Sequence, residues 1–186
     1  MKVSALDAEF LKLAEHSLRR HHLPRIERCL ETLSSQQIWW RPNEASNSAG
    51  NLVLHLAGNV RQWIVGGLSG APNARQRDLE FSERGPVQRA RLIRTLRSAV
   101  LDACRVLRRL TPKQLRAPYT IQGLPVTGLN AAFHVVEHFA FHSGQILFIT
   151  KQLRSRDLRF TRLPSDMRPS TPALRRKPRS RDLPVL

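Results

Sequence analysis

The segment 128–150, "GLNAAFHVVEHFAFHSGQILFIT", constrains the fold more than any other part of the sequence. Its apolar residues recur at helical spacing, and Glu137 is its only formal charge. A helix with apolar residues on most of its sides is stable in water only when other elements cover it. We therefore expect a helix from 128 to about 153 that is buried nearly all round.

The rest of the chain offers helices to cover this segment and very little strand. Apolar residues recur at helical spacing over 6–33, 49–65 and 86–110. Pro24 lies inside the first of these runs, so we expect a kink or break near Leu23.

Turn-forming residues set the expected boundaries of these elements. The second helix is expected to begin after an N-cap at Asn47 or Ser48 and to stop at Gly66-Gly67. Between the last two helices, residues 118–128 predict a small hairpin around Gln122-Gly123.

Together these patterns predict an all-α fold, a four-helix bundle with a short hairpin before the last helix. At least two of the connections are long, so the patterns do not fix a simple up-down-up-down order. We expect the bundle domain to span 1–160. Residues 161–186 are rich in Pro and Arg and are expected to form a disordered basic tail.

The net charge of the chain is +17, and it is unevenly spread. From Lys151 to the end, eleven Lys and Arg and three Asp give +8. Such a balance fits contact with nucleic acid or another polyanion. No fold signature of a nucleic-acid-binding module accompanies it, so we do not favour such a partner.

Cysteine usage and hydropathy indicate the setting of the protein. Cys29 and Cys104 lie in apolar runs and predict two buried, reduced thiols. The sequence shows no apolar leader segment and no run of about 20 apolar residues. We therefore expect a cytoplasmic protein without a membrane span.

The last helix carries His134, His138 and His142 at intervals of four. Histidines at i and i+4 share one face about 6 Å apart along the axis, which suits two ligands of one metal ion. The ends of the row are about 12 Å apart, too far for one ion. The row therefore supplies one pair of ligands and one spare histidine.

A third ligand is offered by the second helix, in "NLVLHLAGNVRQWI" (51–64). One stripe of this helix is polar yet uncharged and contains His55, Gly58 and Asn59, which an interior site explains better than an open surface does. With a pair from the last helix, His55 predicts a three-histidine site that keeps a position open for water or a thiolate. Asn59, Gln145 and Glu137 are candidates to contact the ligands or bound water.

Two other interpretations use the same residues. "HVVEH" fits the inverted zinc-protease pattern H-x-x-E-H, which also requires an acidic ligand downstream. No glutamate follows Glu137, and we do not favour a peptidase. Alternatively, the histidines are hydrogen-bonded members of a metal-free bundle.

Two paired motifs have separate interpretations. Trp39-Trp40 either closes the end of the bundle or forms an aromatic wall at the mouth of a pocket. His21-His22 points its rings about 100° apart on a helix, so the pair cannot chelate, and we expect both to be exposed.

Taken together, "NLVLHLAGNVRQWI" and "HVVEHFAFHSGQILFITK" (134–151) resemble the DinB superfamily. The resemblance is closest to a bacterial branch described as a domain of unknown function, DUF1572. "IWWRPNEASNS" (38–48) and "RDLEF" (77–81) match that branch too. The resemblance covers residues 6–160.

The resemblance implies a bundle with up-down-down-up order and a divalent metal, often zinc or nickel, held by His55, His138 and His142. It places His134 outside the ligand set and implies a homodimer. Well-understood members of other branches are thiol-dependent transferases or isomerases, in which the metal activates a low-molecular-weight thiol. We therefore expect a metal-dependent enzyme that acts on a small molecule. The alternative is a non-enzymatic basic protein whose metal only stabilises the bundle and which contacts a polyanion.

Overall fold

The computed structural model describes residues 5–72 and 74–160 and is mostly helical, with one small two-stranded sheet. In chain order the elements are α1 (Ala5–His16), α2 (Leu23–Thr32), α3 (Ser35–Ile38), α4 (Ala49–Val60), α5 (Gly67–Ser69), α6 (Arg77–Ser82), α7 (Arg89–Leu107), α8 (Pro112–Arg116), β1 (Pro118–Ile121), β2 (Leu124–Thr127) and α9 (Gly128–Arg154).

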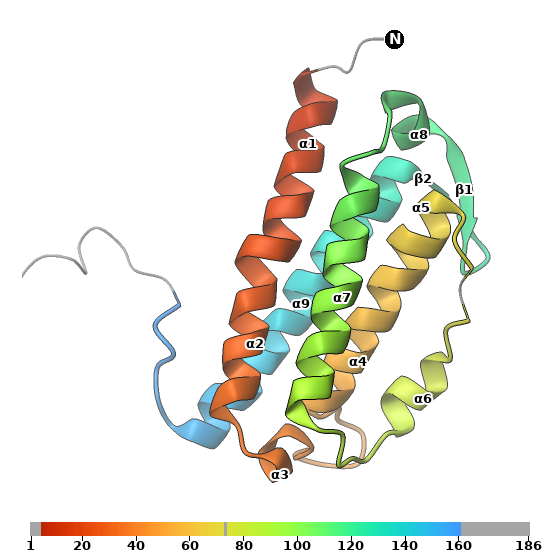
Figure 1. The fold of residues 1–186 in the computed structure, drawn as a ribbon. Coiled ribbons are helices and arrows are strands. Elements are labelled where there is room, and N and C mark those ends of the chain that lie inside the picture. The colour runs from red at the N-terminus through yellow and green to blue at the C-terminus, as the bar shows by residue number, and fades with distance from the viewer. Residues whose placement is uncertain (1–4, 73, 161–186) are drawn as a thin grey trace, which may run out of the picture.

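Four long helical segments pack side by side: α1 with α2, α4 with α5, α7, and α9 (Figure 1). The first and last of these run in one direction, and α4 and α7 run in the opposite direction. Because α4 and α7 are parallel, the connection 70–88 has to return along the length of the molecule. It carries α6, which packs against α4 (Figure 1).

Of the predicted kink or break near Leu23, the break is wrong because the first long helix is continuous, but the helix does depart from regular α geometry directly before Leu23. A π-helical turn, Ser17–His22, joins α1 directly to α2, and Pro24 occupies the first turn of α2. In a regular α-helix a proline ring collides with the carbonyl group four residues earlier. The wider π turn before Pro24 lets the helix continue without that collision.

The second long helix begins where one of the two predicted caps lies. The Ser48 hydroxyl accepts a hydrogen bond from the Asn51 N–H at 3.1 Å, and the Asn51 amide oxygen accepts one from the Ser48 N–H at 3.2 Å. The helix then runs through Gly66-Gly67 and ends at Gly70, which has φ 73°. The predicted stop was too early because Gly67 serves close packing: a Cβ there would lie 2.5 Å from Ile121 Cδ1 in the hairpin.

The positions of the hairpin and of the last helix along the chain agree with the prediction. Strands β1 and β2 pair antiparallel, with Ile121 opposite Leu124. Gln122 and Gly123 form the turn with φ of 56° and 77°, the positive values that a two-residue hairpin loop of this kind requires. The third helix was expected over 86–110 but spans only Arg89–Leu107. Three short helices, α3, α6 and α8, were not predicted.

Helix α9 has an exposed apolar face, so the expectation that it is buried nearly all round is wrong. Phe133, Phe141 and Phe148 are 53%, 64% and 69% exposed, whereas Phe139 is fully buried. Apolar spacing marks the residues that neighbouring helices can cover but does not show which of them a neighbour reaches. Helix α9 packs against α2 and α4 and leaves its outer side open.

The two cysteines are free and buried, as predicted. Burial raises the pKa of both thiols, that of Cys104 to about 11. Among the described residues, no helix is both long and apolar enough to cross a membrane. The predicted basic tail, 161–186, lies outside the described residues.

Candidate metal centre

His55, His138 and His142 come together between α4 and α9. The Nε2 atoms of His55 and His138 face each other at 2.8 Å. The His142 ring lies 5.0 Å from the His55 ring and 4.4 Å from the His138 ring, measured between centroids. One nitrogen from each of the three rings lies within 4.8 Å of the others, so the cluster can hold a metal ion.

His134 lies outside this cluster, although its ring stacks on that of His138 with 5.3 Å between the centroids, and its other contacts are with the second long helix. Its ring packs on Trp63 at a centroid distance of 4.0 Å, and its Nε2 is 3.4 Å from Asn59 Nδ2. The row of three histidines therefore divides into one pair facing His55 and one spare residue. The H-x-x-E-H interpretation needs His134 and Glu137 at the metal, but His134 lies outside the cluster and Glu137 is exposed.

Two of the three rings are held in orientation by a hydrogen bond at Nδ1. Nδ1 of His55 is 3.0 Å from Glu80 Oε2, and Nδ1 of His142 is 2.6 Å from Gln145 Oε1. Both oxygens are acceptors, so each Nδ1 carries the hydrogen. In the neutral rings this leaves the Nε2 lone pairs available to a metal.

Glu80 is itself held by a buried arginine. Arg75, whose side chain is only 4% exposed, donates from Nε to Glu80 Oε1 and from Nη2 to Oε2, each at 2.7 Å. Nη1 of Arg75 donates to Gln62 Oε1 at 2.8 Å. Arg75 Nη2 also lies 3.1 Å from His55 Nδ1, a contact between two donors that follows from their sharing one carboxylate oxygen.

Gly58 makes room for the Glu80 carboxylate on the surface of α4. A Cβ at this position would lie 1.9 Å from Glu80 Oε1 and 2.9 Å from Arg75 Nε. The absence of a side chain at Gly58 therefore lets α6 approach α4 and admits the side chains of Glu80 and Arg75. Asn51 fixes the same segment, because its Nδ2 donates to the carbonyl oxygens of Glu80 and Glu83, both at 2.9 Å.

The electrostatics of the site favour neutral His138 and His142 rings and an ionised Glu80. Burial, with smaller electrostatic contributions from the neighbouring His142 and His55 side chains, lowers the pKa of His138 to about 3. Burial also lowers the pKa of His142. For Glu80, burial works against ionisation, but hydrogen bonds from Arg75 and His55 outweigh it and lower the pKa. At neutral pH, the His138 and His142 rings can therefore offer lone pairs without first losing a proton.

The three residues predicted beside the ligands have different surroundings. Gln145 contacts His142, whereas Asn59 contacts the spare His134. Glu137 is exposed, and its charge acts on His134. Sequence reasoning missed Glu80 and Arg75. The only signals for them were the uncharged stripe around Gly58 and the "RDLEF" motif, which was noted without a role.

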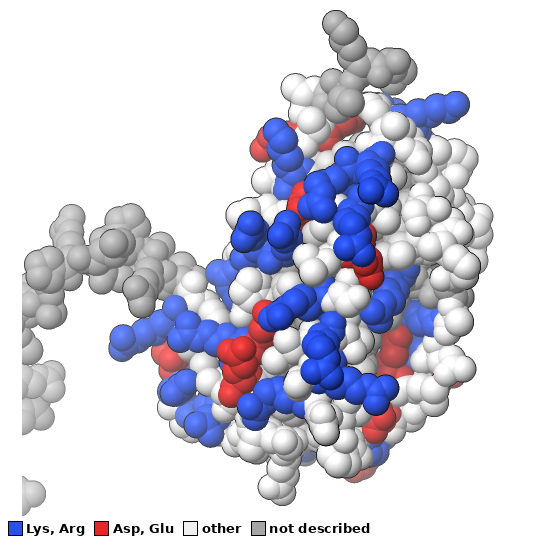
Figure 2. Space-filling model, in the orientation of Figure 1, with Lys and Arg blue, Asp and Glu red and all other residues white. Residues whose placement is uncertain are grey.

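On the face formed by α1, α2 and α7, acidic residues lie among the basic ones (Figure 2). Arg97 pairs with Glu27, Arg105 with Asp102 and Arg108 with Glu15. These pairs neutralise some of the arginines on α7 and at its C-terminal end. Contact with a polyanion remains a prediction.

The sequence pattern of DUF1572, a protein family of unknown function, matches residues 5–167. The chain belongs to the DUF1572 family. No curated protein matches it. Its fold is similar to that of a conserved protein from Enterococcus faecalis known from a crystal structure, with a TM-score of 0.63 and 17% sequence identity. The similarity covers 84% of this chain and 99% of that protein, and at this identity it concerns the fold alone.

Proposed function

We propose that this DUF1572 protein is a metal-dependent enzyme in which His55, His138 and His142 hold one divalent ion. One observation carries the proposal. The ring nitrogens converge between α4 and α9, while Glu80 and Gln145 hold the opposite nitrogens of His55 and His142. Three imidazole donors suit zinc or nickel and leave a position open.

The fold supports a four-helix bundle of the DinB type. The first and last long helices run opposite to α4 and α7, which corresponds to up-down-down-up order (Figure 1). In that arrangement the second and last helices are neighbours, as His55 and the α9 histidine pair require. The same superfamily resemblance is the basis for expecting a homodimer, whereas the expected cytoplasmic location rests on the cysteine usage and hydropathy of the sequence.

The chemistry proposed is activation of a small thiol or of water. A bound divalent ion supplies a positive charge that lowers the pKa of a thiol or water beside it. The protein contributes imidazole ligands, and the Nδ1–H of His55 donates to the Glu80 carboxylate. Gln145 holds His142 in the same way, and Arg75 keeps Glu80 ionised. A thiol-dependent transferase or isomerase acting on a small electrophile fits these properties.

The test is the metal content of tag-free protein purified without added metal, measured by elemental mass spectrometry. We expect about one zinc or nickel ion per chain in the wild type. His55→Ala, His138→Ala and His142→Ala should each lose it, because each removes one ligand. The matched control, His134→Ala, should keep it.

Two results would contradict this assignment. If His134→Ala empties the site as fully as His142→Ala, the ligand pair on α9 is the wrong one. If no sample binds zinc or nickel even after incubation with the ions, His55 and His138 form a hydrogen-bonded pair in a metal-free bundle. With the metal established, loss of thiol in the presence of electrophiles, compared between wild type and His142→Ala, tests the activity.

A further inference from the structure

A pocket of about 580 Å³ lies beside the histidine cluster. It is formed by the outer side of α9, by Leu52 of α4 and by the loop 40–47 that leads into α4. Its volume falls within the range of small-molecule binding sites. Its position is contiguous with the proposed metal centre, because two of its lining residues contact a ligand. Gln145 is hydrogen-bonded to His142 Nδ1 at 2.6 Å, and the Phe141 ring lies 5.2 Å from the His142 ring.

The lining of this pocket is aromatic and carries no formal charge. Trp40, Phe141 and Phe148 form aromatic walls, and the polar groups are neutral amides and a hydroxyl, from Asn47, Gln145, Gln152 and Ser46. Such a lining offers ring faces and edges for stacking, with neutral hydrogen-bonding groups at its margin. A charged ligand group would be desolvated there without a charged partner.

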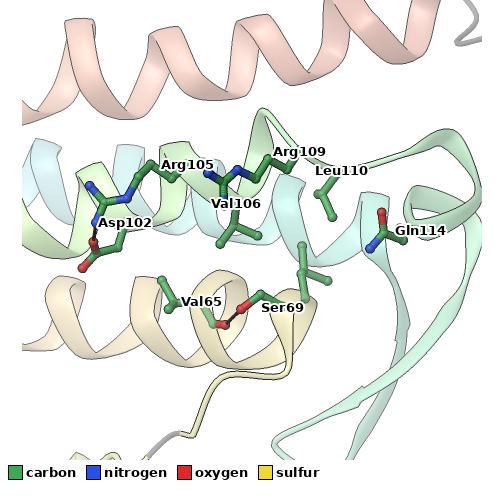
Figure 3. A pocket seen from close by; sticks show the side chains of 9 residues that line it. Val65, Ser69, Asp102, Arg105, Val106, Arg109, Leu110 and Gln114 are labelled. Atoms are coloured by element: carbon green, nitrogen blue, oxygen red, sulfur yellow. Dashed lines mark hydrogen bonds and ion pairs between the residues drawn. The ribbon is translucent and has the colours of Figure 1, made fainter.

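Other pockets of the described chain are lined by charged side chains. One of about 420 Å³, between the end of the second long helix, α7 and α8, contains Asp102, Arg105 and Arg109 (Figure 3). Another of about 620 Å³, on the other side of α4, contains Arg61, Arg75, Glu80 and Glu83. In a chain with 31 basic residues, a pocket lined without any of them favours a neutral ligand.

The aromatic walls are also incompletely covered. Phe148 is 69% and Phe141 64% exposed, so both rings retain apolar surface that an occupant can remove from water. Gly144 lies in the lining of the pocket, and a Cβ at this position would meet nothing within 4 Å. The pocket therefore has free space beside Gly144.

We propose that this pocket binds the neutral aromatic part of a small molecule and holds it next to the histidine cluster. Only the position of the occupant beside a metal ion rests on the proposed function. The substrate class is an uncharged aromatic compound, and Trp40, Phe141 and Phe148 bind it.

The test is calorimetric titration with three probes of similar size: 2-naphthalenemethanol, which is neutral, 2-naphthoate, and 2-naphthylmethylammonium. The wild-type protein should bind the neutral probe with a Kd below about 1 mM and both charged probes at least about tenfold more weakly. Gly144→Leu places a side chain in the open space and should weaken binding of the neutral probe at least about tenfold. Ala140→Leu, one turn earlier on α9 and outside the pocket, should leave binding unchanged. Both variants replace small residues on the exposed side of the helix, so loss of folding is not expected, and circular dichroism checks this.

The proposal is overturned if Gly144→Leu binds like the wild type or if the charged probes bind as well as the neutral one. It is also overturned if no probe binds. If, in addition, Phe148→Ala converts a dimer to a monomer, the aromatic face is the contact with a second copy of the chain. Metal content measured on the same samples separates the two proposals. A Gly144-sensitive site in protein that takes up no metal leaves the pocket standing without the metal centre. Bound metal with no probe binding leaves the metal centre standing without the pocket.

Discussion

At the scale of single residues, Glu80 holds the proton on His55 Nδ1 by accepting its hydrogen bond, and Arg75 holds the Glu80 carboxylate in place. The carboxylate accepts from His55 at 3.0 Å and from Arg75 at 2.7 Å through each oxygen. A carboxylate on the far nitrogen of an imidazole fixes the tautomer and raises the basicity of the nitrogen that faces the metal. This acid is therefore expected to control metal affinity without touching the metal.

Glu80→Gln should weaken metal binding by about 10- to 100-fold. The amide keeps the shape of the side chain but loses the negative charge that Arg75 and His55 share. Competition with a chromophoric chelator measures the affinity. Glu83→Gln, three residues further along the same connection, is the matched control, because Glu83 accepts from the backbone of Arg84 and Gly85 instead. Equal affinities in the two variants would remove Glu80 from the metal centre.

The histidine set could be inferred from the sequence because its members lie on regular helices. Interval and polarity indicate that neighbouring histidines of the row share a face and that His55 faces an uncharged environment. The choice of His138 and His142 over His134 came from the family resemblance. Glu80 could not be found in this way. It lies on a six-residue helix whose position depends on contacts such as Asn51 with the Glu80 and Glu83 carbonyls, and no periodicity encodes those contacts.

At the scale of elements, α6 and α4 meet through Gly58. The four long helices could be predicted from apolar spacing. The short helices could not, and neither could the π turn Ser17–His22 or a second π turn, Arg61–Gly66, inside the second long helix. A π turn adds one residue to a single turn of the helix, so the apolar spacing stays helical on either side of it. The exposed face of α9 was mispredicted for a related reason: the spacing of Phe133, Phe141 and Phe148 resembles that of core residues.

Gly58→Ala should weaken metal binding, although alanine is the better helix former. The added Cβ would lie 1.9 Å from Glu80 Oε1, so the Glu80 side chain has to move away from His55. Gly144→Ala is the matched control on α9, with nothing within 4 Å of the new Cβ. It should stabilise the fold by about 0.5–1 kcal/mol and leave the metal in place. Thermal unfolding and chelator competition measure both effects, and unchanged affinity in Gly58→Ala would contradict the packing of Glu80 on α4.

At the scale of the whole molecule, acid stability depends on histidines that stay neutral in the fold. The predicted exposure of His21 is correct, but His22 is half-buried, with its ring 6.1 Å from the Phe139 ring. Burial, with the nearby His21 and Arg25, lowers the pKa of His22 from 6.5 to about 4. Between these pH values the unfolded chain binds more protons than the folded chain, so the free energy of unfolding falls as the pH falls through this range.

His22→Gln should make that fall less steep, by at most the contribution of one proton, about 1.4 kcal/mol per pH unit. Urea unfolding between pH 7 and pH 4 in the presence of a chelator measures the slope without metal release. His21→Gln, at the exposed neighbour, should change it less. If His22→Gln and the wild type lose stability in parallel, the neutral state of His22 does not contribute.

The parallel course of α4 and α7 has a consequence for protein engineering. The chain between them has to travel back along α4, and it is this return that brings Arg75 and Glu80 behind His55. A redesigned bundle whose helices alternate in direction would replace the connection 70–88 with a tight turn. Such a redesign would shorten the chain and remove the carboxylate from the far side of His55. A short connection between the helices and a carboxylate that orients His55 are therefore competing design goals in this scaffold.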